Sequence, residues 1–136
     1  MDAFNPIRSA LISQLLTVVD LPEVAWENRS YDAVINTPYV QPFVSFSTPT
    51  QSTLGTDGRN EIRGFMQLTL VYPIDNGNGD TNDMAAAILE KFKRGTLLTY
   101  GGVDVKCTHS YPSLAIQDGD WFRTPLTINF YSITEN

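Results

Sequence analysis

Apolar and polar residues alternate along two stretches of this chain, from Ile62 to Tyr72 and from Phe122 to Phe130. Alternation with a period of two is typical of a strand that buries one face and exposes the other. Most of the apolar residues stand at even positions in both stretches. We therefore predict two long strands whose even-numbered side chains face the core.

The segment from Asn5 to Val19 has the apolar spacing of an amphipathic helix. Asn5 is a favourable N-cap, and Pro6 suits the first helical position. Because proline disfavours helical geometry in the residue before it, we expect the helix to end ahead of Pro22. The apolar residues that recur at helical intervals are Ile7, Leu11, Leu15 and Val18.

A second helix follows a turn rich in Gly, Asn and Asp over residues 75–79. Asp80 or Thr81 serves as its N-cap, and Gly95 supplies its C-cap. One face of this helix is apolar, formed by Met84, Ala85, Ile88, Leu89 and Phe92.

Shorter strands are indicated by β-branched and aromatic residues bounded by turn residues. Pro42 restricts its strand to a sheet edge or a bulge, and Gly101-Gly102 predicts a tight hairpin. The further predicted strands are 23–29 around Trp26, 39–47, 97–100 and 103–107. The resulting order is α-β-β-β-α-β-β-β. It predicts one α+β domain over residues 1–136, with a mainly antiparallel or mixed sheet and two helices on one face.

A long loop separates two of these strands, over residues 47–60. It is rich in Ser, Thr, Gly, Asp and Asn, and its single large apolar residue is Leu54. Loops of this length are usually functional. We expect it to be mobile in the isolated subunit and to become ordered on assembly.

The overall charge and composition narrow the functional classes. The net charge of −6 argues against a general nucleic-acid surface, which works through Lys and Arg. We expect no membrane span, because no run of about 18 apolar residues occurs. The N-terminus also lacks the pattern of a secretion signal. These features favour a cytosolic type of domain.

Candidate chemistry in the chain is sparse. Cys107 and His109 would share a face of a regular strand, although a small buried thiol is the more usual role of a free cysteine. Asp118 and Asp120 flank Gly119, which predicts a tight turn rather than a hydrolase pair. The turn at 75–79 has glycines where a calcium loop needs oxygen ligands. We therefore expect no catalytic residue, metal or cofactor.

Three cations cluster at the end of the second predicted helix, at Lys91, Lys93 and Arg94. Cations there complement the helix dipole, so a solvated helix end is one reading. A docking patch is the other.

The short motifs resemble, almost from end to end, those of phage tail terminator proteins, the tail-completion proteins of long non-contractile tails. Their order and spacing carry the resemblance more than any single motif does. The matching segments are Leu21-Pro22, Ala25-Trp26-Glu27-Asn28, Asn36-Thr37-Pro38-Tyr39-Val40, Thr53-Leu54-Gly55, Gly58-Arg59, Arg63-Gly64, Val71-Tyr72-Pro73, Lys91-Phe92, Arg94-Gly95, Gly102-Val103, Tyr111-Pro112 and Asp120-Trp121-Phe122.

The resemblance implies a structural protein of the virion, assembled in the host cytoplasm. It implies a hexameric ring on the head-proximal end of the tail tube, which stops tube polymerisation and offers a joining surface to the head connector. The expected partners are a second copy, the tail tube protein and the neck protein. Six copies at −6 each carry −36, so the genome would pass through the lumen without specific binding.

The candidate interface residues are Thr53, Leu54, Arg59, Arg63, Lys91, Lys93 and Arg94. Two other functions remain open at this point. One is a neck or head-completion protein of the same virion. The other is a small carboxylate-dependent hydrolase.

Overall fold

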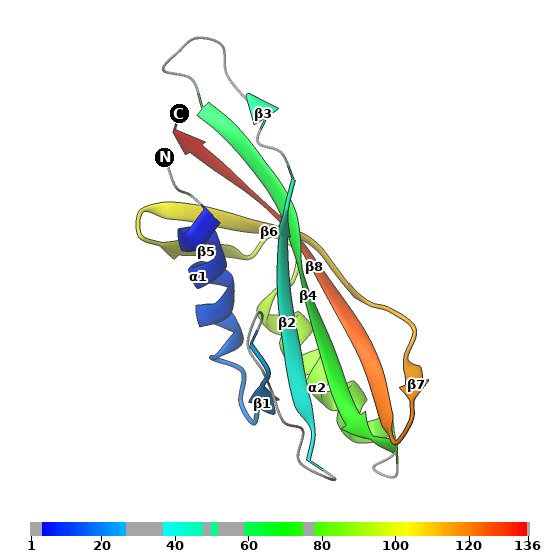
Figure 1. Cartoon of the computed structure of the whole chain (residues 1–136). Helices are drawn as coiled ribbons and strands as arrows, with labels where there is room; N and C mark the ends of the chain where they lie inside the picture. Colours follow the sequence, from blue (N-terminus) through cyan, green and yellow to red (C-terminus); the bar gives the residue numbers. More distant parts are fainter. Residues whose placement is uncertain (1–3, 27–36, 48–49, 52–58, 75–77, 136) are drawn as a thin grey trace.

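The computed structural model describes residues 4–26, 37–47, 50–51, 59–74 and 78–135 of the chain. Two helices and a twisted sheet form two layers (Figure 1). The elements in chain order are α1 (Phe4–Leu15), β1 (Glu23–Val24), β2 (Tyr39–Phe46), β3 (Thr50–Gln51), β4 (Arg59–Pro73), α2 (Asn78–Lys91), β5 (Leu97–Tyr100), β6 (Val103–Pro112), β7 (Ile116–Asp118) and β8 (Trp121–Glu135).

The eight described strands form one sheet in the order β1-β2-β4-β8-β6-β5. The short strands β3 and β7 pair with β4 and β8 beside this path. All pairs are antiparallel except β1 with β2. The two long strands pair along their whole length, from Arg59 opposite Glu135 to Pro73 opposite Trp121. The predicted α+β class and the mainly antiparallel sheet are confirmed.

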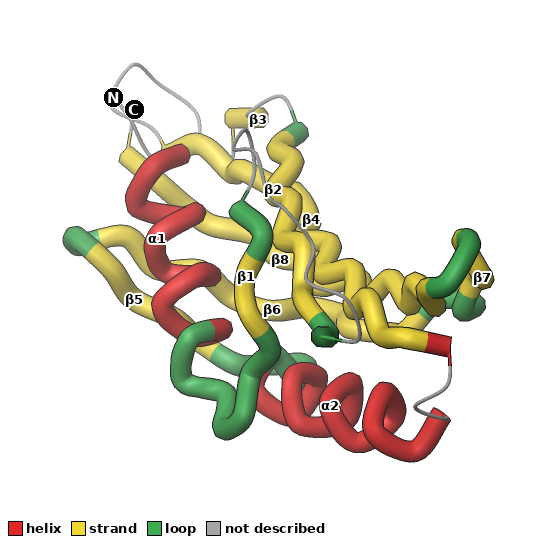
Figure 2. Tube along the Cα trace, turned by 60° about the horizontal axis from the view of Figure 1, so that its bottom comes forward, coloured by secondary structure: helices red, strands yellow, loops and turns green. Residues whose placement is uncertain are grey.

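Both helices lie on one face of the sheet (Figure 2). The core beneath them contains the even-numbered residues of the two long strands, as their alternation predicted. Met66, Leu68 and Leu70 of β4 are fully buried there, and Leu126 and Ile128 of β8 are fully buried beside them. The face assignment made from the sequence is therefore confirmed.

Pro42 lies in β2 at a position where its missing N–H costs the sheet no hydrogen bond. The Ser47 N–H donates to the Arg63 carbonyl of β4, whereas the Val40 carbonyl accepts from Ala25 on the opposite side of β2. Even-numbered residues of β2 thus direct their backbone groups away from β4. The N–H that proline lacks would have pointed outward, which agrees with the predicted edge position.

The hairpin between β5 and β6 also forms as predicted. Gly101 and Gly102 have φ of 58° and 80°. Both central residues of this two-residue turn need a positive φ, which glycine adopts without steric cost.

The first helix ends four residues earlier than predicted, at Leu15 instead of Val19. The N–H groups of Thr17 and Val18 donate three residues back, and the Thr17 hydroxyl also donates to the Gln14 carbonyl at 2.6 Å. These tighter turns end the α-helix. Val18 is nevertheless buried, so its place in the apolar pattern indicated a buried residue and not a longer helix.

Other predicted boundaries also differ from the structure. The strand predicted for 103–107 extends to Pro112, and β7 was not predicted. The second helix begins at Asn78 rather than at Asp80 or Thr81. The strand predicted for 23–29 covers only Glu23–Val24, and residues 27–29 lie outside the described part of the chain. The predicted loop at 47–60 contains β3, which pairs with Glu61 and Asn60 of β4. Strand pairing therefore continues into both sides of this loop.

Candidate assembly surfaces

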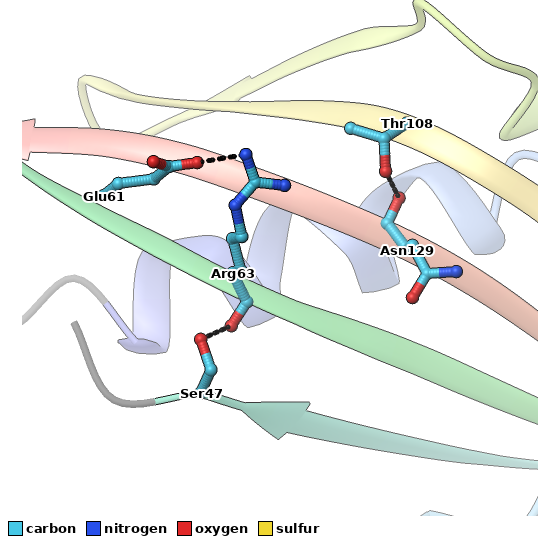
Figure 3. Close-up of polar contacts among 5 residues, drawn as sticks. All are labelled: Ser47, Glu61, Arg63, Thr108 and Asn129. Carbon is cyan, nitrogen blue, oxygen red and sulfur yellow. Dashed lines mark hydrogen bonds and ion pairs between the residues drawn. The ribbon is translucent and has the colours of Figure 1, made fainter. Parts of the chain in front are cut away.

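Cys107 and His109 do not share a face. The pairing of β6 with β8 shifts by one residue between them, because Thr108 is inserted as a β-bulge. The Thr108 hydroxyl donates to the Asn129 carbonyl at 3.3 Å (Figure 3). Cys107 is fully buried and His109 is exposed. This corrects the regular strand geometry on which a thiol and imidazole pair depended.

Asp118 and Asp120 flank the turn between β7 and β8, as the sequence predicted. The Asp118 carboxylate pairs with Arg123 at 2.8 Å, and the Asp120 carbonyl accepts from the Ile74 N–H. Among the described residues, no three His, Cys, Asp or Glu side chains lie together as a metal site. No helix in that part of the chain is long and apolar enough to cross a membrane.

The sheet face that points away from α1 and α2 is called the open face here. Arg63 lies on it with an exposed side chain, and its guanidinium pairs with Glu61 at 2.6 Å (Figure 3). The same guanidinium lies 5.4 Å from the centre of the Tyr131 ring, opposite it on β8. The Arg63 carbonyl accepts from the Ser47 hydroxyl at 2.8 Å. The Arg63 guanidinium therefore has two neighbours on this face, Glu61 and Tyr131, while Ser47 binds its backbone.

Apolar side chains on the open face were not singled out from the sequence. Phe43 is 50% exposed and its ring lies 6.5 Å from that of Phe65. Ile133 is 40% exposed beside Tyr131. The available signal was that the odd positions of the long strands, which should be polar on a solvated face, include aromatic and aliphatic residues. Tyr, Phe and Arg together are typical of protein interfaces.

One end of the open face is already covered within the chain. Ala25, Tyr39, Val71 and Trp121 form a second, smaller buried cluster there. The rings of Tyr39 and Trp121 meet edge to face at 5.6 Å. This cluster covers part of the open face, whereas Phe43 and Ile133 remain exposed on it.

The three cations of the second helix lie at the opposite layer of the molecule. Lys91 is the last residue of α2, and its carbonyl accepts from the Gln14 side chain of α1 at 2.9 Å. Lys93 pairs with Glu90 at 3.1 Å, and Arg94 is exposed. The structure therefore separates these cations from Arg63 and does not join the two groups into one surface.

The remaining candidates belong to the 47–60 region. Arg59 begins β4, where its backbone pairs with Glu135. Thr53 and Leu54 lie outside the described residues, so the role expected for them stays a prediction. The expected mobility of this loop likewise stays a prediction.

Comparison with known proteins gives one functional match. The family model described as phage tail terminator protein matches residues 6–130. A solved structure of a protein whose name states no function is also similar, with a TM-score of 0.76 and 21% sequence identity. That similarity covers 98% of this chain and 97% of the other, and at this identity it shows a shared fold alone. No curated protein matches the chain.

The family match covers nearly the whole chain, and among the described elements it leaves out only the first two residues of α1 and the end of β8. The family is a structural one of the phage tail, whose members interact with other virion proteins. This protein therefore belongs to the phage tail terminator protein family.

Proposed function

We propose that six copies of this protein form a ring on the head-proximal end of the tail tube. The ring ends tube polymerisation and gives the head connector a surface to join. The observation that carries this proposal is the family match over residues 6–130. The exposed aromatic residues of the open face support it, since a tail component must present apolar surface to its neighbours.

A ring requires a head-to-tail contact between copies, because a two-fold contact closes at a dimer. Such a contact joins two different surfaces of the same chain. The described residues offer surfaces in both layers: the open face around Arg63, and the helix layer that carries Lys91 and Arg94.

We assign the open face around Arg63 to the contact with the tail tube protein. Its guanidinium is already oriented by Glu61 and Tyr131, so little side-chain entropy is lost on binding. Ile133, opposite Glu61, supplies exposed apolar area close to it, and Phe43, opposite Gln67, supplies more farther along the same face. Exposed apolar area and an oriented arginine together are typical of interface centres.

The experiment compares phage that lack this protein with the parent phage by electron microscopy. Tails of uncontrolled length are expected, since nothing would stop tube growth. Normal-length tails without heads would instead identify a neck protein, and intact infectious particles would reject both roles. Class averages of parent tail ends should show a six-fold collar, so a collar of another symmetry would contradict the ring.

A further inference from the structure

The edge strand β5 leaves backbone hydrogen-bonding groups without a partner. The sheet ends at β5, which has a neighbouring strand, β6, on one side only. The Cys107 N–H donates to the Thr96 carbonyl at 2.9 Å, so the even-numbered residues of this segment direct their backbone groups toward β6. Leu97 and Thr99 therefore direct their N–H and C=O groups away from the sheet. No hydrogen bond among the described residues satisfies these groups.

The space beside β5 is open to a further strand. Figure 2 shows β5 along the outer margin of the molecule, with α1 over the face that the helices cover. Leu98 of β5 is buried in the core on that face, whereas Leu97 is 61% exposed and Thr99 is also exposed. The first helix thus covers one face of β5 and leaves its edge open.

Other free edges of the described sheet carry features that oppose pairing. Pro42 lacks the outward N–H of β2, and Pro112 lacks it at the end of β6, because the Ser113 N–H next to it is the one that donates to β8. The strands β1 and β7 have two and three residues and include the charged Glu23 and Asp118. Proline, charge and short length are the usual protection of edge strands. None of the four residues of β5 is charged or proline, so its edge can accept a strand.

A row of side chains on the open face connects this edge to the surface around Arg63. Four residues lie opposite one another in the register of β5, β6, β8 and β4, namely Leu97, Lys106, Tyr131 and Arg63. The Lys106 side chain is exposed and has no acidic partner among the described ion pairs. Asp104 of the same strand accepts from the Thr99 hydroxyl at 2.8 Å. The β5 edge is thus continuous with the surface assigned above to the tail tube protein, and it has an unpaired cation beside it.

We propose that the tail tube protein adds an extended strand to the edge of β5. The backbone of this strand pairs with the outward groups of Leu97 and Thr99. One of its apolar side chains packs beside Leu97 on the open face, and one of its carboxylates reaches Lys106. Main-chain hydrogen bonds give such added strands their affinity, and alternate side chains give them specificity. This inference rests on the function proposed above and names the form and the chemistry of the partner segment.

Two other occupants fit these observations less well. A second β5 edge would pair through a two-fold contact, which closes at a dimer and cannot build a ring. A nucleic acid has no row of N–H and C=O groups to pair with the edge, and the net charge of −6 repels it.

The first test removes one outward donor and keeps the pairing of β5 with β6. Thr99→Pro deletes an N–H that points away from β6, whereas the control Thr99→Val keeps it, and both variants lose the hydroxyl that binds Asp104. The probe is tails purified from phage that lack this protein, and co-sedimentation with them gives the dissociation constant. Thr99→Pro should raise this constant by about tenfold or more, and Thr99→Val should stay within about threefold. Thermal melting shows that each variant is folded, and equal binding of the two would overturn the proposal.

Amide hydrogen exchange tests the same edge without a substitution. In the free protein the N–H groups of Leu97 and Thr99 should exchange rapidly, whereas those of Leu98 and Tyr100 point toward β6 and should be protected. In protein bound to the purified tails, the peptide that covers residues 97–100 should gain the protection of about two amides. Unchanged exchange of this peptide on saturated tails would overturn the proposal.

A charge substitution tests the chemistry of the partner strand. Lys106→Glu should weaken binding to the same tails by about tenfold or more at low salt, because two carboxylates then face each other. Lys106→Arg keeps the charge and should stay within about threefold. Equal binding of these two variants would contradict the proposed carboxylate.

These results separate the strand addition from the proposed function. Normal tail length in phage that lack the protein rejects the function. Uncontrolled tail length without the protein, together with full tail binding by Thr99→Pro, rejects the strand addition and leaves the function standing. Loss of self-association by Thr99→Pro in sedimentation velocity, with tail binding kept, assigns the edge to a second copy. Protection of the 97–100 peptide by a DNA oligonucleotide and not by tails assigns the edge to nucleic acid, and either result rejects the proposal.

Discussion

Phe130 lies directly opposite Gly64 in the register of β8 and β4, and its ring occupies the space that a side chain at Gly64 would need. A Cβ placed on Gly64 would lie 2.9 Å from the Cζ atom of Phe130 and would overlap the Ser45 carbonyl oxygen. Phe46 meets the Phe130 ring edge to face at 6.0 Å. Glycine is therefore needed at this position because no room is left for a Cβ, and not because the backbone needs a positive φ.

Gly64→Ala should therefore lower the free energy of unfolding, by about 1–3 kcal/mol. Alanine is the better residue in a strand by about 0.5–1 kcal/mol, but the Ser45 carbonyl belongs to the backbone and cannot move alone. Urea unfolding followed by circular dichroism measures the change. Gln67→Ala, on the same strand and half-buried on the open face, is the control and should lose less than about 0.5 kcal/mol. Equal losses for the two variants would contradict the packing argument.

Leu68→Asp should unfold the protein. Leu68 is fully buried beneath the helices, and an unpaired carboxylate there costs several kcal/mol against a total stability of about 5–15 kcal/mol. Gln67→Asp places the same carboxylate one residue away on the open face and should leave the fold intact. Circular dichroism and one-dimensional NMR spectra distinguish the two. A folded Leu68→Asp protein with unchanged melting would overturn the face assignment.

Arg63→Ala should change assembly more than stability. Its ion pair with Glu61 and its contact with the Tyr131 ring are both made by an exposed side chain, so their loss should cost about 1 kcal/mol or less. If the open face binds the tail tube, phage carrying this variant should make tails of irregular length. Thr127→Ala, a small change near the middle of the same face, is the control. Normal tails with Arg63→Ala would remove Arg63 from the interface.

Leu54→Ser and Arg59→Glu test the loop region. Loss of tail-length control with unchanged monomer melting would assign the altered residue to assembly. A lower melting temperature for Leu54→Ser with normal tails would return Leu54 to the core of its own subunit. If neither melting nor tail length changes, the loop is only a connector and the expectation for it is wrong.

The Cys107 thiol should make stability fall in alkaline solution. Burial raises its pKa from the ordinary 9.0 to about 11. Below pH 9 both folded and unfolded chains hold the proton, so the group has no effect on the balance. Above pH 9 the unfolded chain loses the proton first, and stability falls by up to about 1.4 kcal/mol per pH unit until pH approaches 11.

Unfolding by urea at pH 8, 9 and 10 measures this slope, and Cys107→Ala is the control that should lack it. Burial, and then Asp80, also raise the pKa of Tyr72 above its ordinary 10.0, so Tyr72 lowers stability only as pH approaches 10 and does so in both proteins. The same slope in both proteins would show that another group causes it.

The positions of the long strands, and the sheet face on which each of their side chains lies, could be predicted from the sequence. The reason is local: successive side chains of a strand point to opposite faces, so the apolar positions between Ile62 and Tyr72 mark the buried face wherever the strand lies. Likewise, Gly101-Gly102 predicted its hairpin because the turn itself demands positive φ. The family resemblance carried by short motifs was confirmed by the match over residues 6–130.

The grouping of distant residues was decided by the tertiary structure. The bulge at Thr108 depends on how β6 pairs with β8, and it separates Cys107 from His109 although they are two residues apart. The sequence pattern could not show that α1 ends at Leu15, because Val18 is buried although it lies outside the helix. An apolar pattern shows which side chains are buried. Strand pairing and helix ends depend instead on which distant segments come into contact. Residues such as Leu97 and Lys106 become one surface only when β5 folds back onto β6, because long-range contacts bring together groups that no local pattern relates.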